Sequence, residues 1–170
     1  IWSRLVGSEM CIRDSNTGGM GAVSPSPDET NKLREHIIEK ILNPVAKGMV
    51  LDGKPYTGIL YVGLMLTDTG PKVIEFNCRF GDPEAQVILP RLESDLLDLI
   101  LLHCNQAQKD AVIKFSNDVA ITVVMANKGY PGSYEPNSII KDIDLISLKK
   151  DCFIYHSGTG MNQKGEIIAK

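Results

Sequence analysis

Three polar side chains alternate with apolar ones in V-I-E-F-N-C-R-F, residues 73–80, and their types suit phosphate chemistry. Glu75 and Asn77 offer a carboxylate and an amide oxygen, which are ligands that Mg²⁺ accepts. Arg79 adds a guanidinium, the group that forks onto a phosphate or carboxylate. Because side chains alternate across a strand, we expect all three on one face. That face has two interpretations: the solvated side of an edge hairpin, or a metal and phosphate site.

Two neighbouring segments favour the second interpretation. The loop F-G-D-P-E, residues 80–84, follows at once and brings Asp82 and Glu84 towards the end of the strand. The segment N-T-G-G-M-G, residues 16–21, is rich in glycine and can approach an anion with its N–H groups. It lacks the G-K-[ST] of a phosphate-binding Walker loop and is not a Rossmann fingerprint. We expect Asp82 to cap a helix that begins with Pro83.

Hydrophobic spacing predicts the elements that position these residues. A β-hairpin is expected, with its turn at residues 68–70. Pro44 is expected to kink or end the first helix, and Ser94 to cap the last. The predicted helices span residues 28 or 30 to 47, 83–89 and 94–104. The predicted strands span residues 56–66, 72–80, 119–126, 139–147 and 151–156.

Composition is that of a soluble globular protein and excludes several classes. The net charge of −3 gives no basic excess for nucleic acid or an anionic membrane, and no apolar run could span a bilayer. The four scattered cysteines, at positions 11, 78, 104 and 152, form no C-x-x-C pair or zinc-like spacing. With no signal peptide at the N-terminus, these features predict a cytoplasmic protein with reduced thiols.

The string E-F-N-C-R, residues 75–79, resembles the E-x-N-x-R metal strand of ATP-grasp ligases. The longer strings N-T-G-G-M-G-A-V-S-P-S-P, G-I-L-Y-V-G-L-M and E-F-N-C-R-F-G-D-P-E-A-Q are similar, in order and spacing, to the phosphoribosylamine–glycine ligase family. K-G-Y-P-G and H-S-G-T-G resemble its C-terminal domain. The resemblance runs from residue 16 to residue 170.

The resemblance implies a reaction and a set of roles. The family joins glycine to 5-phosphoribosylamine with ATP, through glycyl phosphate, in purine biosynthesis. Glu75 and Asn77 would ligate Mg²⁺ or Mn²⁺. Arg79 would be catalytic and bind substrate, by stabilising the acyl phosphate or phosphoryl oxygens. Asn16, Thr17 and Gly18 would line the substrate side. Many ATP-grasp enzymes add an acidic ligand from the preceding strand, where this sequence has Gly63.

The expected fold is α+β: the C-terminal lobe of an ATP-grasp fold, an antiparallel sheet with packed helices, then an incomplete small β-rich C-terminal domain. The segments would be residues 1–15, a foreign tail; 16–106, the partial ATP-grasp lobe; and 107–170, the truncated C-terminal domain. The nucleotide-clamping lobe would lie outside this chain, so we expect a fragment that is inactive alone.

The expected partners are small molecules, namely glycine, 5-phosphoribosylamine and ATP, with neither nucleic acid nor membrane, and a monomer at full length. Two alternatives stay open from the sequence. One is a different ATP-grasp carboxylate–amine ligase. The other is a non-catalytic remnant that binds metal or nucleotide.

Overall fold

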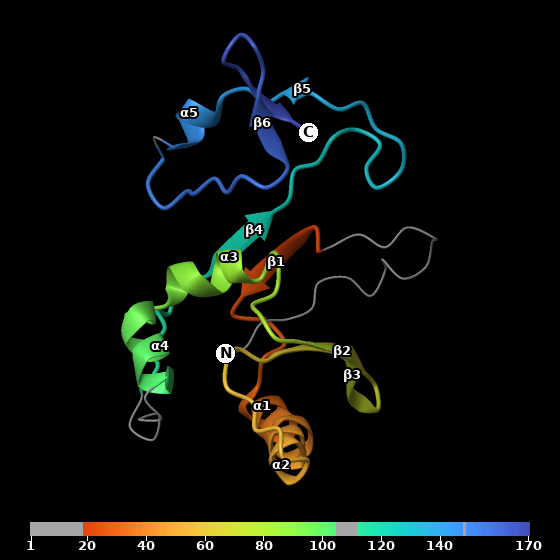
Figure 1. Cartoon of the computed structure of the whole chain (residues 1–170), viewed down its shortest axis with the longest axis vertical. Helices are drawn as coiled ribbons and strands as arrows, with labels where there is room; N and C mark the ends of the chain where they lie inside the picture. The colour runs from red at the N-terminus through yellow and green to blue at the C-terminus, as the bar shows by residue number, and fades with distance from the viewer. Residues whose placement is uncertain (1–18, 105–111, 148) are drawn as a thin grey trace. The chain divides into compact units, whose positions relative to one another are not determined.

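The computed structural model describes residues 19–104, 112–147 and 149–170 of the 170-residue chain. They form two compact units, residues 19–123 and residues 124–170, and each mixes short helices with antiparallel strands (Figure 1). The division falls later than the expected boundary after residue 106. The cause is that Phe115 bridges to Leu92 and the strand at residues 120–123 pairs within the first unit.

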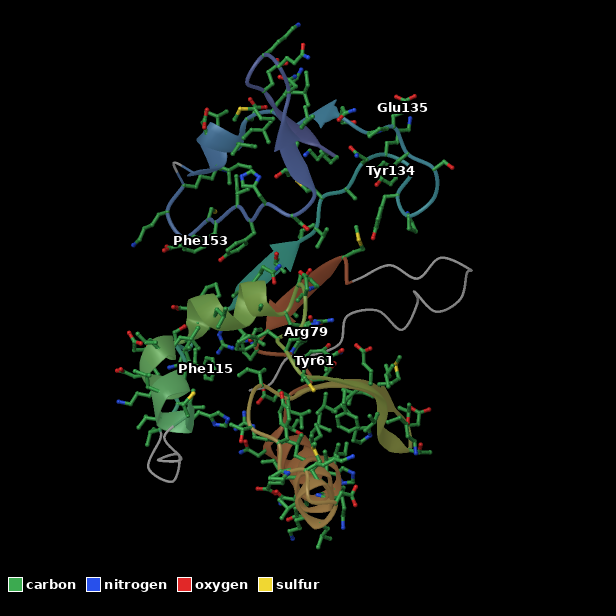
Figure 2. All side chains as sticks on the ribbon, in the orientation of Figure 1. Tyr61, Arg79, Phe115, Tyr134, Glu135 and Phe153 are labelled. Atoms are coloured by element: carbon green, nitrogen blue, oxygen red, sulfur yellow. The ribbon has the colours of Figure 1, made fainter. Side chains whose placement is uncertain are left out.

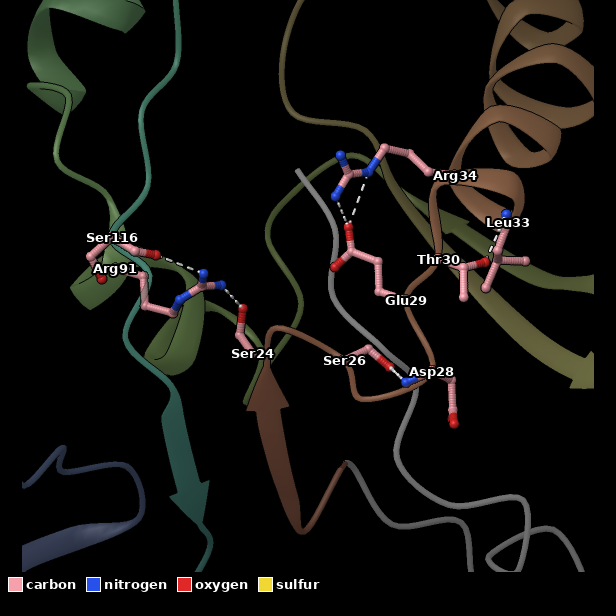
Figure 3. Close-up of polar contacts among 9 residues, drawn as sticks. All are labelled: Ser24, Ser26, Asp28, Glu29, Thr30, Leu33, Arg34, Arg91 and Ser116. Atoms are coloured by element: carbon pink, nitrogen blue, oxygen red, sulfur yellow. Dashed lines mark hydrogen bonds and ion pairs between the residues drawn. The ribbon is translucent and has the colours of Figure 1, made fainter.

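The first helical segment of unit one changes its winding in the middle. Thr30 is the N-cap, as one of the two predicted starts requires: its Oγ1 accepts from the Leu33 N–H at 3.1 Å (Figure 3). Of the two outcomes expected at Pro44, the helix does not end there but its winding changes just before it. Pro44 sits in the first turn of α2, directly after a π-helical turn that absorbs the irregularity, where a residue without an N–H is tolerated. The elements are α1 (Asn31–Ile37), η2 (Ile38–Leu42) and α2 (Asn43–Leu51).

The predicted hairpin is confirmed, with shorter strands. β2 (Tyr61–Thr67) pairs antiparallel with β3 (Gly70–Asn77), and the chain reverses at residues 68–69. A β-bulge leaves Ile74 unpaired, because Gly63 faces Glu75 while Leu64 faces Val73. β3 is largely exposed, since Val73 is 42% and Ile74 53% exposed.

A small core joins a second strand pair to a short helix. β1 (Gly21–Ser24) pairs antiparallel with β4 (Ala120–Val123). The short helix α3 (Ala85–Ile88), continued by the 3₁₀ turn η3 (Leu89–Arg91), contacts both strands (Figure 1). The predicted central strand over 119–126 is therefore one member of a two-stranded sheet. The core consists of Ala22, Val87 and Ile88, with Phe115 and Ala120 packed against it.

The helix α4 (Leu96–Cys104) begins at a different cap from the one predicted. Asp95 Oδ1 accepts from the N–H groups of Leu97 and Asp98 at 2.8 and 3.0 Å. Ser94 instead accepts from the Lys114 N–H at 2.8 Å. Asp and Ser are both favoured N-caps, so adjacent candidates cannot be separated by residue type.

Arg91 connects three parts of the first unit that are distant in sequence. Its guanidinium donates to Ser24 Oγ at 2.7 Å, the Ser116 carbonyl at 2.8 Å and the Asp118 carbonyl at 2.7 Å (Figure 3). It also lies over the Phe115 ring, 6.0 Å from the centroid. Because Ser24 is only 1% exposed, this cation satisfies a buried hydroxyl while tying η3 to β1.

The second unit contains a three-stranded antiparallel sheet in the order β5–β7–β6. Of the strand predicted over 139–147 only Ile139 is in a strand, because residues 143–147 are helical. The strand predicted over 151–156 is wrong, since residues 152–156 have no regular structure. Short apolar runs such as I-D-L-I fit both periods, and pairing with β7 selects mostly other segments. The elements are β5 (Ser138–Ile139), α5 (Ile143–Ser147), β6 (Thr159–Met161) and β7 (Ile167–Ala169).

The sequence predicted reduced cysteines and no membrane-spanning segment. Cys78, Cys104 and Cys152 are free thiols, and Cys11 lies outside the described residues. In the described ranges, no helix has the length and apolar character needed to cross a bilayer.

Replacing Arg91 by Ala is expected to lower the free energy of unfolding by about 2–3 kcal/mol, because one buried hydroxyl and two carbonyls lose a charged donor. Circular dichroism during urea unfolding measures the loss. Arg34→Ala is the matched control: Arg34 forms an exposed ion pair with Glu29 (Figure 3), and its loss should cost less than about 1 kcal/mol. Equal losses for the two variants would contradict the role given to Arg91.

Candidate active site

The end of β3 brings the two predicted metal ligands together. Asn77 Nδ2 donates to Glu75 Oε1 at 2.9 Å, so the two side chains share one face, as predicted. Across the hairpin, Tyr61 faces Asn77 and Gly63 faces Glu75. A Cβ atom at Gly63 would lie 3.0 Å from Glu75 Cγ, which is tighter than ordinary packing. Gly63 therefore supplies space for Glu75, in the place where the resemblance would put another acidic ligand.

A cation at this pair would replace its hydrogen bond, whose length of 2.9 Å is ordinary for N–H···O. Octahedral Mg²⁺ with ligands at about 2.0–2.1 Å has neighbouring ligand atoms about 2.9 Å apart. That separation is the one between the Glu75 and Asn77 polar atoms, and a half-turn of the Asn77 amide would put an oxygen in place of the nitrogen. Among the described residues, no group of three His, Cys, Asp or Glu side chains could hold a metal ion. A cation here would take its other ligands from water or phosphate oxygens.

Arg79 lies beyond the strand, so the alternation that predicted its position ends before it. β3 stops at Asn77, and Arg79 is an exposed residue in the following bend. Its Nη1 donates to the Phe80 carbonyl at 2.8 Å. The guanidinium lies near Tyr61, the register partner of Asn77: its charge lowers the pKa of Tyr61, and Figure 2 shows the Arg79 and Tyr61 side chains in the same region. Arg79 is exposed as a residue, and a guanidinium is a group that binds anions.

The loop after Arg79 packs against the glycine-rich segment. A Cβ atom at Gly19 would lie 2.7 Å from Pro83 Cδ, so only glycine permits this approach. Asp82 does not cap α3, contrary to expectation: its Oδ1 accepts from Gln86 Nε2 at 2.8 Å, while the Ala85 N–H donates to the Gly81 carbonyl.

Three other predicted site residues, at positions 16–18, lie outside the described residues. They are Asn16, Thr17 and Gly18.

The sequence did not reveal a buried acid beside the site. Glu84 is 6% exposed, and its Oε1 accepts from the Tyr61 hydroxyl at 3.2 Å. Burial first, then the Glu84 carboxylate, raises the pKa of Tyr61; Glu75 also raises this pKa and Arg79 lowers it. The sequence indicated that the F-G-D-P-E loop brings Glu84 towards the end of the strand, but neither its burial nor its contact with Tyr61.

An apolar hollow of about 860 Å³ in the first unit adjoins the site, since Tyr61, Phe80 and Gly81 are among the residues that line it. Leu33 and Ile37 of α1, Leu64 of β2 and Leu99 of α4 contribute to its lining. Glu75, Asn77 and Arg79 do not line it. The polar chemistry of this unit is therefore concentrated at the end of the hairpin.

Comparison with known proteins gives the class. Residues 7–85 match the family model described as the ATP-grasp (A) domain of phosphoribosylglycinamide synthetase. The match includes β2, β3 and the loop to Glu84, and ATP-grasp ligases generally use ATP with divalent metal ions. It begins inside residues 1–15, the segment expected to be foreign.

The relatives are more specific than the class. The chain is 48% identical over 154 residues to a phosphoribosylamine–glycine ligase of Listeria innocua and 45% identical over 157 residues to the chloroplastic enzyme of that name from Arabidopsis thaliana. A ligase of the same name from Vigna unguiculata is 43% identical. Each match covers 91% of this chain but 36%, 30% and 50%, respectively, of the relative. The chain thus spans a third to a half of their length.

The raised pKa of Tyr61 predicts a change in stability at alkaline pH. An unfolded tyrosine titrates near pH 10. Because the folded pKa is higher, the contribution of Tyr61 is fully present below about pH 10 and is lost as pH rises through the folded value. We expect one tyrosine in ultraviolet titration to ionise later than the others. In the Tyr61→Phe variant this late ionisation should be absent. The free energy of unfolding should also fall less steeply above about pH 10 than in the parent protein. A variant with an unchanged titration curve would contradict the assignment.

Proposed function

We propose that this chain takes part in the ATP-dependent ligation of glycine to 5-phosphoribosylamine, in purine biosynthesis in the cytoplasm. The observation that supports this most is the Glu75–Asn77 pair at 2.9 Å, with Arg79 beside it, on a segment that matches an ATP-grasp domain. The ligase names of the relatives supply the substrate class.

The reaction divides into two displacements. The carboxylate of glycine attacks the γ-phosphorus of ATP, which forms glycyl phosphate and releases ADP. The amine of 5-phosphoribosylamine then attacks the glycyl carbonyl, forms the amide and releases phosphate. Bound Mg²⁺ or Mn²⁺ would neutralise charge on the transferring phosphoryl group.

Each site residue has a role that follows from its chemistry. Glu75 and Asn77 would hold the cation through their oxygens and so orient the phosphate chain. Arg79, an exposed residue, would bind the phosphoryl oxygens of ATP and then the acyl phosphate.

Asn16, Thr17 and Gly18 would line the substrate side of the same site. The packing of Gly19 on Pro83 supports this placement, because Gly19 is the residue that follows them. Residues 124–170 would be part of the C-terminal domain of the ligase, which at full length would act as a monomer on small molecules.

A non-catalytic role is the second candidate. Glu75 and Arg79 are exposed at a two-stranded hairpin, as they would be on the solvated side of an edge hairpin. In addition, the described residues offer no group of three His, Cys, Asp or Glu side chains that could hold a metal ion. The names of the relatives favour the ligase over this role and over other ATP-grasp ligases.

A chimera tests the proposed reaction. Residues 16–170 of this chain would replace the matched segment of the Listeria innocua relative, and ADP release would be followed with glycine and 5-phosphoribosylamine. We expect turnover that needs both substrates. Glu75→Gln should lower kcat by about 10²–10³-fold, because charge stabilisation at the transferring phosphoryl group is lost.

Asp68→Asn is the matched control, since Asp68 is an exposed carboxylate in the turn of the same hairpin. It should leave kcat within about twofold, as surface substitutions away from a site usually do. A folded chimera without turnover, or a Glu75→Gln chimera as active as the parent, would refute the proposed function.

A further inference from the structure

Glu84 is a buried carboxylate that accepts a hydrogen bond from the opposite strand of the hairpin. It is 6% exposed, and the Tyr61 hydroxyl donates to its Oε1. The ion pair between Arg34 and Glu29 does not include Glu84. An ionised carboxylate out of water is costly unless hydrogen bonds compensate, so this contact constrains where both residues can lie.

Close packing at Gly81 shows that the same contact is tightly built. A Cβ atom there would lie 2.8 Å from Glu84 Cδ and 2.8 Å from Tyr61 Cε2, nearer than real Cβ atoms come. The backbone of Gly81 therefore lies close to both Tyr61 and Glu84. This observation is independent of the hydrogen bond, and it places the loop against the Tyr61–Glu84 pair.

The pair also lies at both ends of the segment that contains Arg79. Tyr61 is the register partner of Asn77, where β3 ends. Glu84 directly precedes α3, whose Val87 and Ile88 are buried in the core. The Tyr61–Glu84 hydrogen bond therefore closes a loop from Asn77 to Glu84, with Arg79 inside it.

We propose that Tyr61 and Glu84 are positioning residues that hold the 78–83 loop, and so set Arg79 against the Glu75–Asn77 pair. The inference rests on the proposed function for its chemical purpose. Neither residue needs to touch substrate. Their hydrogen bond joins the hairpin to the end of the loop and acts with the packing of Pro83 on Gly19 and the bond from the Ala85 N–H to the Gly81 carbonyl.

Backbone ¹⁵N relaxation and Mn²⁺ titration of the 170-residue chain test the proposal. In Tyr61→Phe, the order parameters of Arg79 and Gly81 should fall from about 0.85 to below about 0.6. The Mn²⁺ dissociation constant, measured by water proton relaxation, should rise severalfold. Glu84→Gln keeps an oxygen that accepts from Tyr61, so it should preserve both values within about twofold.

Tyr134→Phe removes a hydroxyl from the second unit and serves as the control, with no change expected. Unchanged order parameters in a folded Tyr61→Phe, or a Glu84→Gln loop as mobile as that of Tyr61→Phe, would overturn the positioning role. If the parent chain does not bind Mn²⁺, that result counts against the proposed function. The order parameters test the positioning role of Tyr61 and Glu84 independently of Mn²⁺ binding.

Discussion

The burial of the Glu84 carboxylate is the constraint on which the site depends. An acid that is 6% exposed must have a donor, and Tyr61 supplies it from the neighbouring hairpin. That one contact joins the start of α3 to the strand opposite Asn77. It explains why residue 81 must be glycine, since a side chain there would collide with both partners. The positions of Glu75, Asn77 and Arg79 thus depend on the buried contact between Tyr61 and Glu84 as well as on strand geometry.

A second constraint maintains the unit that contains this site. Arg91 satisfies the buried Ser24 hydroxyl and two carbonyls, so that η3, β1 and the approach to β4 stay together around Val87 and Ile88. These contacts anchor the far side of α3, whereas Tyr61 and Glu84 anchor its start. The loop with Arg79 lies between a rigid helix and a hairpin whose outer faces are open. Such a loop can present a guanidinium to an anion and stay attached to its support.

The sequence predicted the parts of the site that depend on local rules. Alternation placed Glu75 and Asn77 on one face, and turn chemistry found the hairpin. It failed where tertiary contacts decide. Strand pairing stops at Asn77, so alternation no longer determines the position of Arg79. Asp95 took the cap expected of Ser94. In the second unit, β7 paired mostly with segments other than the predicted strands. The Tyr61–Glu84 contact joins residues 23 positions apart, which no local pattern reveals.

The most direct test of the central claim is where a metal ion binds on this chain. Paramagnetic Mn²⁺, titrated into isotope-labelled protein and followed by NMR, broadens signals close to the ion even when binding is weak. The account predicts that the Asn77 side-chain amide and the Arg79 Nε–H broaden first, and that Glu75→Gln abolishes this selectivity. Broadening that begins at other carboxylates, such as Asp142 or Glu135, with Asn77 unaffected, would contradict it.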